Sequence, residues 1–298
     1  MANATSSWRS FIRNILVGFL KIAVPAYLGV LLLLMLFENW LVYHPAKADQ
    51  DWQPAPIPLI NGVPTPIIED VELTSADGTR LHGWWAPDPG TGDVALYFHG
   101  NAGNLSHRGP SQLKMRELLK IGVLQVDYPG YGKSDGSPSE AGCYAAADAA
   151  YDWLVHQKKI DPKRIIIYGV SLGGGVAVNL ASRRDHRALV LVKTFTSMPD
   201  VGQNMHPWLP VRWLMRNRFD SVGKIGQIRR PVFVAGSIHD QLIPYEQGQR
   251  LFEAANEPKE FFTLEGGHND GLSPRFFESL RLFLRERAPV GEPVPASR

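Results

Sequence analysis

The residues with the clearest chemical meaning surround one serine, in the segment GVSLG at 169–173. An isoleucine-rich run over 164–169 leads into this segment and a run of small residues follows it, so the pattern G-x-S-x-G lies between an expected strand and an expected helix. Such a turn strains the serine backbone, exposes the hydroxyl, and directs the free N–H groups of the helix start towards it. Side chains at the two glycines would collide with the neighbouring strand and helix. The pattern predicts that Ser171 is a nucleophile.

A phosphate-binding turn is the competing interpretation of the three glycines at 173–175. The segment contains no G-x-G-x-x-G. The other glycine-rich stretch, GYGKSDG at 130–136, has Asp127 where the motif G-x-x-x-x-G-K-[ST] requires its first glycine. Nucleotide binding is therefore disfavoured.

A serine hydroxyl needs an imidazole to accept its proton, and the imidazole needs a carboxylate to fix its tautomer. In G-x-S-x-G proteins the partners follow in the order serine, acid, histidine. Asp240 comes just after the expected strand 231–237, and His268 follows the strand 260–266. Each has an ordinary alternative, since Asp240 could cap a helix near Pro244 and His268 could bond to Asp270. Their order and position favour a proton relay with Ser171.

Other acids and bases fit less well. His99 precedes the serine in the chain, and His239 adjoins Asp240 and should point elsewhere. Asp200 and Asp220 lie in an irregular interval, whereas Asp240 follows a clear strand. These four residues remain the alternatives.

An acyl-transfer site also needs N–H donors for the oxyanion of its tetrahedral intermediate. The N–H of Leu172, directly after the nucleophile, is one candidate. The second should come from the loop HGNAGN that follows the strand 94–100, and we expect it to be the N–H of Asn101. The alternative is a glycine turn that only separates strand from helix.

Short apolar runs alternate with helical spacing over most of the chain. Strands are expected at 94–100, 122–130, 164–169, 188–195, 231–237 and 260–266, after a hairpin at 71–87 that turns at Asp77-Gly78. Helices are expected between them, at 113–119, 145–157, 176–183, 248–255 and 276–285. This alternation predicts an α/β fold with a mostly parallel sheet covered on both faces, whose strand ends carry the site.

The composition narrows the function further. The 298 residues carry a net charge of +2 with acids and bases spread along the chain, so no nucleic-acid partner is expected. Cys143 is the only cysteine, which excludes an internal disulfide and a cysteine-based metal site. The oligomeric state cannot be read from the sequence.

The N-terminal segment is of a different kind. Residues 15–37 are apolar except for Lys21, which lies close enough to one end to snorkel, and they predict one transmembrane helix. Arg9 and Arg13 precede it, so residues 1–14 should be cytoplasmic and the remaining domain on the non-cytoplasmic side. A cleavable signal is the alternative, since AKA at 46–48 has the form of a cleavage site. The length of the apolar run favours an uncleaved anchor.

The remaining chain divides into three parts, one of which contains an insertion. Proline-rich residues 38–70 are expected to form a linker, 71–287 the α/β domain, and 288–298 a disordered tail. Within the domain, 196–230 is longer than a crossover helix requires and rich in Met, Trp and Arg. Its large apolar side chains, which suit an acyl chain or else pack the insertion onto the domain, are Met198, Met205, Trp208, Trp213, Met215 and Phe219.

Taken together, the segments YFHGNAGN, DYPGYGKSDG, GVSLGGG, HD at 239–240 and GGHND resemble the α/β-hydrolase superfamily. More narrowly, they resemble its single-span, short-cap branch, related to serine aminopeptidase-like and acyl-thioesterase-like hydrolases. The likeness covers about 71–287 and the anchor. One departure is the segment VAGSIHD, because the strand before the acid commonly ends in His-Gly.

The resemblance implies a Ser-His-Asp hydrolase without cofactor or metal. By position, Ser171 would be the nucleophile, His268 the base and Asp240 the residue that orients it, with 196–230 as a small cap. Esters or thioesters of acyl or lipid-like molecules are the expected substrates, and the membrane is the expected partner of the N-terminal helix. A peptidase of the aminopeptidase-like branch and a catalytically silent binding module are the alternatives.

Overall fold

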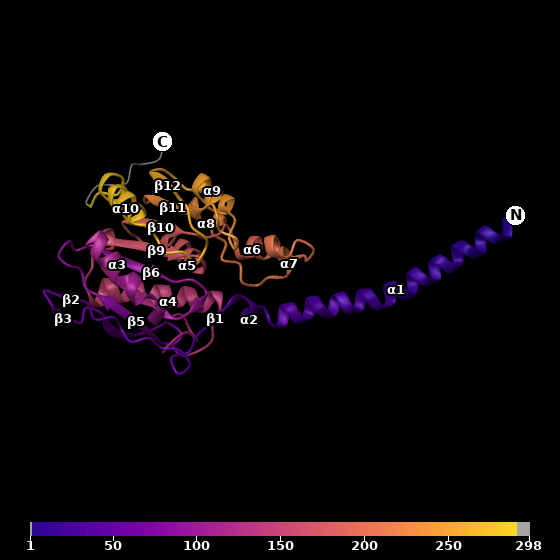
Figure 1. Ribbon diagram of the computed structural model, residues 1–298, viewed down its shortest axis with the longest axis horizontal. Coiled ribbons are helices and arrows are strands. Elements are labelled where there is room, and N and C mark those ends of the chain that lie inside the picture. The colour runs from indigo at the N-terminus through magenta and orange to yellow at the C-terminus, as the bar shows by residue number, and fades with distance from the viewer. Residues whose placement is uncertain (1, 291–298) are drawn as a thin grey trace.

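Eight strands form the central sheet in residues 2–290, the part of the chain that the computed structural model describes (Figure 1). Their order across the sheet is β12-β11-β10-β9-β6-β8-β5-β4. The strands are β4 (Glu69–Thr74), β5 (Arg80–Ala86), β6 (Val94–Phe98), β8 (Gly122–Val126), β9 (Ile165–Val170), β10 (Ala188–Val192), β11 (Val232–Ser237) and β12 (Lys259–Leu264). All neighbours from β8 to β12 pair in parallel, whereas β5 and β4 are antiparallel. The predicted α/β fold with a mostly parallel sheet is confirmed.

Helices cover both faces of this sheet. One face packs on α3 (Gly109–Leu119) and α10 (Pro274–Glu286). The other packs on α4 (Glu140–Asp152), α5 (Leu172–Ala181), α8 (Val222–Ile225) and α9 (Tyr245–Ala254). Three short helical turns complete this part, at Leu105–Arg108, Trp153–Gln157 and Pro162–Arg164. Because both faces are covered, β6, β8 and β10 are apolar throughout except for Gly122 and Gln125, as is typical of parallel strands.

Helix α10 shows how the sequence sets one of these layers. Ser273 caps its first turn by accepting a hydrogen bond from the N–H of Phe276, and Pro274 occupies the first helical position, where no N–H is needed. Apolar side chains then recur every three or four residues and are buried against the sheet, at Phe276, Phe277, Leu280, Phe283 and Leu284.

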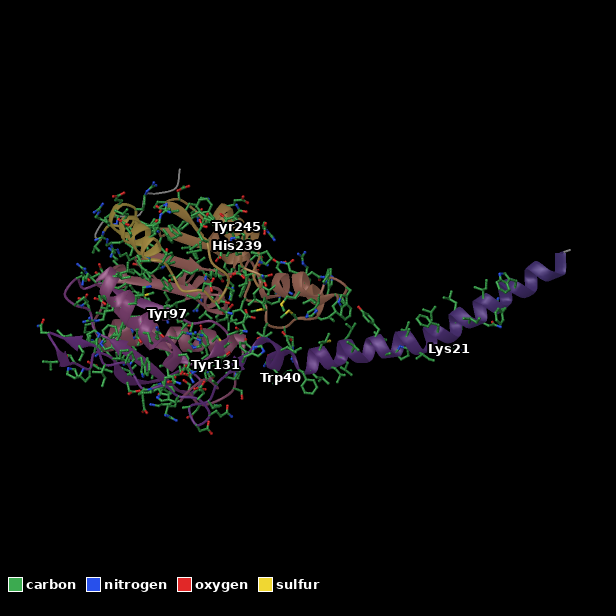
Figure 2. All side chains as sticks on the ribbon, in the orientation of Figure 1. Lys21, Trp40, Tyr97, Tyr131, His239 and Tyr245 are labelled. Carbon is green, nitrogen blue, oxygen red and sulfur yellow. The ribbon has the colours of Figure 1, made fainter. Side chains whose placement is uncertain are left out.

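The N-terminal helix α1 (Ala2–Leu36) projects away from the domain (Figure 1). Its stretch Phe11–Leu36 is long and apolar enough to cross a membrane. The helix is longer than the predicted span 15–37, because it starts at Ala2 and ends at Leu36, and Phe37 separates it from α2 (Glu38–Val42). Lys21 lies near the middle of α1, and Trp40 lies at the junction with the domain (Figure 2).

A free linker over 38–70 is wrong for its first part. Val42 and Tyr43 are buried in the domain, and the Tyr43 hydroxyl donates to Oδ1 of Asn217 at 2.7 Å. The next residues form β1 (His44–Pro45), which pairs with β7 (Ala102–Gly103). Composition suggested a tether, but the apolar side chains before the prolines have a hydrophobic core to pack into.

The proline-rich part of this segment is also attached to the domain. It contains a small hairpin of β2 (Leu59–Ile60) and β3 (Val63–Pro64). The ring of Trp52 packs edge-on against His82 and Trp84. The chain therefore passes from α1 into the domain without a free tether.

The insertion 196–230 begins with α6 (Met198–Met205) and α7 (Val211–Leu214), which lie on the side of the domain from which α1 leaves (Figure 1). Its aromatic side chains have different surroundings. Phe219 is fully buried, whereas Trp208 and Trp213 are 65% and 89% exposed. Packing onto the domain therefore accounts for Phe219 and not for the two tryptophans. The predicted tail 288–298 lies outside the described residues from 291 onwards.

Candidate active site

The segments that follow three parallel strands of the sheet carry the predicted site residues. Ser171 comes directly after β9, Asp240 follows β11, and His268 follows β12. Because these strands run parallel, their carboxyl ends lie at one edge of the sheet. The fold therefore brings together residues that are up to 97 positions apart in the chain.

The turn at Ser171 has the strained geometry that the sequence pattern predicts. Its φ is 53°, in the left-handed region that side chains other than glycine rarely adopt. The Ser171 N–H donates to the carbonyl of Val192 at 3.0 Å, and the Thr194 hydroxyl donates to the Ser171 carbonyl at 2.7 Å. The neighbouring strand β10 and the residues after it therefore hold the strained residue on both sides.

The two glycines of the motif are required by close approach. A Cβ at Gly169 would collide with the backbone of Gly173, and a Cβ at Gly173 would collide with the backbone of Phe98 on β6. Strand, helix and neighbouring strand meet here without room for side chains. This close packing forces the chain to turn sharply, and it leaves Ser171 at the tip of the turn.

A chain of two hydrogen bonds joins the three side chains. Nε2 of His268 lies 3.0 Å from Oγ of Ser171, and Nδ1 of His268 lies 2.7 Å from Oδ2 of Asp240. The Asp240 side chain is 1% exposed and the His268 side chain 14%. In this geometry, the ring nitrogen that faces the carboxylate carries a hydrogen and the one that faces the hydroxyl can accept a proton.

The surroundings of Asp240 keep it ionised. Burial alone would raise the pKa of this carboxyl, but hydrogen bonds from His268 and from the N–H groups of Ile243 and Leu242 outweigh burial and lower its pKa below the ordinary value. One carboxylate oxygen is therefore held by the backbone, and the other is available to the imidazole.

The alternative acids and bases lie in other environments. His99 is fully buried, with Nε2 3.3 Å from Oδ1 of Asp127. His239 is exposed. Asp200 forms an ion pair with Arg212 at 2.9 Å, and Asp220 accepts from the N–H of Gly223. None of these side chains has a hydrogen bond to Ser171 or His268 in residues 2–290.

The two predicted oxyanion donors lie beside Ser171. Leu172 is the first residue of α5, so its N–H has no acceptor within the helix. Asn101 is held by its other groups, because its carbonyl accepts from His44 N–H and from the Tyr131 hydroxyl, at 3.1 and 2.7 Å. Residues 2–290 show no acceptor for its N–H.

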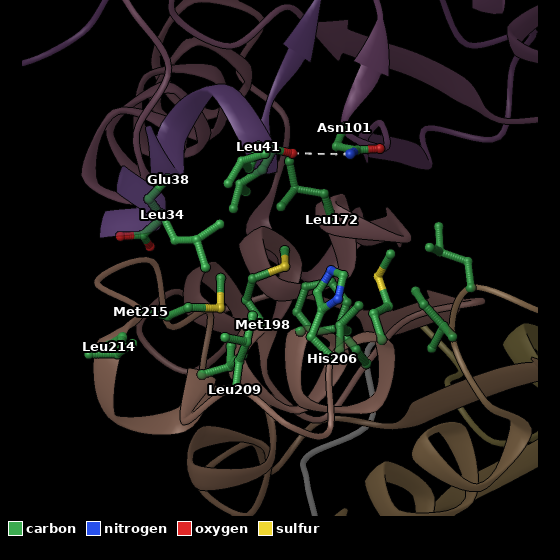
Figure 3. A pocket seen from close by; sticks show the side chains of 18 of the residues that line it. Leu34, Glu38, Leu41, Asn101, Leu172, Met198, His206, Leu209, Leu214 and Met215 are labelled. Atoms are coloured by element: carbon green, nitrogen blue, oxygen red, sulfur yellow. Dashed lines mark hydrogen bonds between the residues drawn. The ribbon is translucent and has the colours of Figure 1, made fainter. Parts of the chain in front are cut away.

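The loop that carries Asn101 runs directly past Ser171. A Cβ at Gly100 would lie 3.5 Å from the Ser171 Cβ. The Asn101 amide Nδ2 donates to the Val42 carbonyl at 3.1 Å, which ties this loop to the end of α2 (Figure 3). The N-terminal helices therefore contribute to the position of this loop.

Ser171 opens into a cavity of about 420 Å³. Side chains of Leu34 and Leu41 lie on one side of the cavity, and side chains of Met198, Leu209 and Met215 lie on the other (Figure 3). Most of the remaining lining is also apolar. Among the described residues, no group of three His, Cys, Asp or Glu side chains is placed to hold a metal ion.

Glu38 fastens the N-terminal helices to the insertion. Its buried carboxylate accepts from the N–H groups of Arg216 and Asn217, at 2.9 and 2.7 Å, and from Nε of Arg216 at 3.0 Å. Burial alone would raise the pKa of Glu38, but the bonds from Asn217 and Arg216 outweigh burial and lower its pKa. This carboxylate thus joins the two sides of the cavity, together with the bonds from Arg216 to the Met35 carbonyl and from Asn217 to Asn39.

Lys193 is a buried residue that the sequence analysis missed. Its Nζ donates to the carbonyls of Gly267, His268 and Asp270, at 2.7, 3.1 and 2.8 Å. Burial lowers the pKa of Lys193 below its ordinary value, because the opposing effect of the nearby Asp240 and Asp270 is smaller. The ammonium group holds the loop that carries His268. Its position directly after the apolar run of β10, in a region otherwise without charge, is the signal that could have identified it.

Comparisons with known proteins agree with this architecture. The sequence model described as "Alpha/beta hydrolase family" matches residues 81–262. Protein Rv2307c of Mycobacterium tuberculosis is 38% identical over 270 residues, which cover 89% of this chain and 93% of the relative. The alpha/beta hydrolase domain-containing protein WAV2 of Arabidopsis thaliana is 32% identical over 245 residues, which cover 75% of this chain and 77% of the relative.

Two solved structures share the fold at low sequence identity. The esterase Pf2001 of Pyrococcus furiosus has a TM-score of 0.65 and 21% identity, and the match covers 82% of this chain and 99% of the esterase. A puromycin-hydrolyzing peptidase of Mycobacterium tuberculosis has a TM-score of 0.61 and 19% identity, and the match covers 74% of this chain and 39% of the peptidase. One fold thus serves both an esterase and a peptidase, so the site itself must decide between them.

Proposed function

We propose that this chain, which belongs to the alpha/beta hydrolase family, is a membrane-anchored serine hydrolase that cleaves ester or thioester bonds of apolar acyl chains. The observation that carries the proposal is the series of hydrogen bonds from Asp240 through His268 to Ser171. The Ser171 end of this series opens into an apolar cavity. The chain supplies a nucleophile and its base, and the cavity supplies an environment for hydrocarbon.

The reaction would follow from this geometry in two halves. Nε2 of His268 accepts the hydroxyl proton while Oγ of Ser171 attacks the acyl carbonyl carbon, and Asp240 stabilises the imidazolium that forms. The N–H groups of Leu172 and Asn101 would bind the oxyanion. His268 then returns the proton to the leaving alcohol or thiol, which leaves an acyl-enzyme. In the second half, His268 accepts a proton from a water molecule that attacks the acyl-enzyme. The carboxylic acid is released as His268 returns the proton to Oγ of Ser171.

The lining of the cavity favours acyl chains over peptides. An aminopeptidase needs an unpaired carboxylate for the amine terminus of its substrate. Glu38 is the only acidic residue among the described residues that line the cavity, and its oxygens are occupied by Arg216 and Asn217. Burial of an apolar chain, at about 25 cal/mol per Å², is the main binding energy that such a lining offers.

The proposed topology places the N-terminus in the cytoplasm and the catalytic domain on the opposite side of the membrane. Arg9 and Arg13 before the apolar stretch support this orientation. Cleavage at 46–48 would remove Glu38, Val42 and Tyr43, which are buried in the domain. These contacts support an uncleaved anchor over a signal peptide.

The test uses the full-length protein in detergent or vesicles. A fluorophosphonate probe should label the wild type and not Ser171→Ala, and the wild type should cleave p-nitrophenyl acyl esters. Hydrolysis of aminoacyl amides without hydrolysis of any acyl ester would favour the peptidase. Folded wild-type protein that no probe labels would favour the binding module.

A further inference from the structure

The catalytic cavity has an unusual wall, because the end of the membrane helix forms part of it. Leu34 and Met35 belong to the last turn of α1, and Leu41 belongs to α2. These side chains line the same cavity as Ser171 and the α6–α7 segment. A site served only by soluble substrates does not require such a wall.

A second hollow, the groove, adjoins the cavity where α1 meets α2. It has a volume of about 500 Å³, and no polar side chain lines it. Its lining residues are Val30, Leu33, Leu34, Phe37, Trp40 and Leu41. Leu34 and Leu41 line both the groove and the catalytic cavity, so the two hollows are separated by these two side chains.

The cap reaches along α1 to the depth of Tyr27. The Tyr27 hydroxyl donates to the carbonyl of Trp208 at 3.5 Å. From Tyr27 to Leu36 the helix rises about 14 Å, which is nearly half of a hydrocarbon core of about 30 Å. If Phe11–Leu36 lies in the bilayer, the tip of the cap therefore lies in the leaflet next to the domain.

The side chains at this tip suit a lipid environment. Met205, Trp208 and Trp213 are 53%, 65% and 89% exposed, although large apolar side chains are usually shielded from water. Tryptophan is enriched where proteins meet the membrane interface. Trp40, which lines the groove, is 74% exposed. The tip of the cap and the groove therefore both present aromatic side chains beside the apolar stretch of α1.

We propose that the substrates are lipids that reside in this leaflet, and that their acyl chains enter the catalytic cavity sideways from the bilayer, past Leu34 and Leu41 where α1 meets α2. The groove, defined by Val30, Leu33, Leu34, Phe37, Trp40 and Leu41, is their access route. A chain that follows this route never leaves an apolar environment, whereas a route through water would expose every methylene. The inference rests on the serine hydrolase function proposed above and adds the source of its substrate.

The test compares two probes on the full-length protein in phosphatidylcholine vesicles. One is a fluorophosphonate with a long alkyl chain that partitions into the bilayer, and the other is a short, polar fluorophosphonate. The measured quantity is the ratio of their labelling rates. Leu33→Trp fills the groove without changing the cavity, since Leu33 lines only the groove. Leu32→Trp is the matched control, because Leu32 is 56% exposed, Leu33 is 55% exposed, and Leu32 lines neither hollow.

The expected result is a ratio at least fivefold lower for Leu33→Trp and within twofold of the wild type for Leu32→Trp. Leu34→Trp, at the boundary of the two hollows, should lower the ratio as well, so the outcome does not depend on one variant. A ratio that stays at the wild-type value in both Leu33→Trp and Leu34→Trp overturns the sideways route and leaves the hydrolase function intact. If neither probe labels the wild type, the proposed function itself fails.

Discussion

The edge of the sheet and the wall of the cavity are built in opposite ways. At the edge, Ser171, His268 and Asp240 are held by directed hydrogen bonds and by a strained turn. In the wall, side chains of α1, α2 and the cap meet through apolar surface, and the buried Glu38 supplies their main polar link. Directed bonds fix atoms to fractions of an ångström, as chemistry requires, whereas apolar contacts tolerate variation. The contrast suggests that the edge determines the reaction and the wall determines the substrate.

Removal of the proposed nucleophile should have the largest effect on activity, and this effect should be confined to the site at the sheet edge. Ser171→Ala should lower kcat for a p-nitrophenyl acyl ester by roughly 10⁶-fold, because the attacking atom is lost. Steady-state hydrolysis by the full-length protein measures this, and the thermal unfolding midpoint should stay near the wild-type value. Residual activity above one hundredth of the wild type would place the nucleophile elsewhere.

Replacement of the buried acid should give the next largest effect. Asp240→Asn should lower kcat by roughly 10⁴-fold, because an amide favours the wrong tautomer of His268. Asp200→Asn, which changes an acid in the cap, is the matched control and should retain most of the activity. An equal loss in both variants would contradict the assignment of Asp240 and the separation of the two regions.

Lys193→Met tests whether the geometry at the sheet edge depends on the lysine that holds the His268 loop. Loss of the ammonium group leaves three partly buried carbonyls without this donor, so the free energy of unfolding should fall by about 1–3 kcal/mol. A shift of His268 by about 1 Å should lower kcat by roughly 10²-fold, with little change in KM. Lys114→Met removes an exposed lysine that donates to the Leu272 carbonyl, and it should change neither quantity appreciably. Unchanged kcat in Lys193→Met would reduce Lys193 to a purely stabilising role.

Glu38→Gln should have the smallest effect, and this effect should be on the stability of the contacts in the cavity wall. The pKa of Glu38 is lowered in the folded chain, so the stabilisation is present above the ordinary pKa of about 4.5 and is lost as the pH falls through the lowered folded value. The variant should therefore be less stable at pH 7, by about 1–2 kcal/mol, and should lose less stability on acidification than the wild type. Thermal unfolding at pH 7 and pH 3.5 measures this difference.

The control for this prediction is Glu72→Gln. Glu72 is a surface acid whose side chain is 71% exposed. Its loss should leave the acid dependence of the wild type unchanged. An equal loss of stability between pH 7 and pH 3.5 in Glu38→Gln and in the wild type would mean that Glu38 does not fasten the wall.

The strands and the strand ends could be predicted because their signals are local. β9 is an apolar run that ends within G-x-S-x-G, and β11 and β12 are followed by short segments that carry Asp240 and His268. In a parallel sheet, such ends meet without any further information. The starts of α3, α4 and α5 were placed four or five residues too late, because their first turns contain glycine, proline or charge and hide the helical period.

The wall could not be predicted in the same way. Glu38 looks like an ordinary acid after an apolar helix, and only its contacts with Arg216 and Asn217, 178 and 179 positions away, reveal its role. The proline-rich composition after Tyr43 suggested a tether, because composition does not show which side chains find a core. Lys193 was missed for the same reason, since its three acceptors lie more than 70 residues further along the chain.

The direct passage from α1 through α2 into β1 has a mechanical consequence. Only Phe37 separates the two helices, and β1 already pairs with the body of the domain. In the anchored form that we propose, no flexible linker therefore allows the domain to change its height or orientation above the bilayer. Ser171 stays at one height and in one orientation, so the enzyme would act as a molecular ruler that cuts only those bonds which a lipid presents at that height.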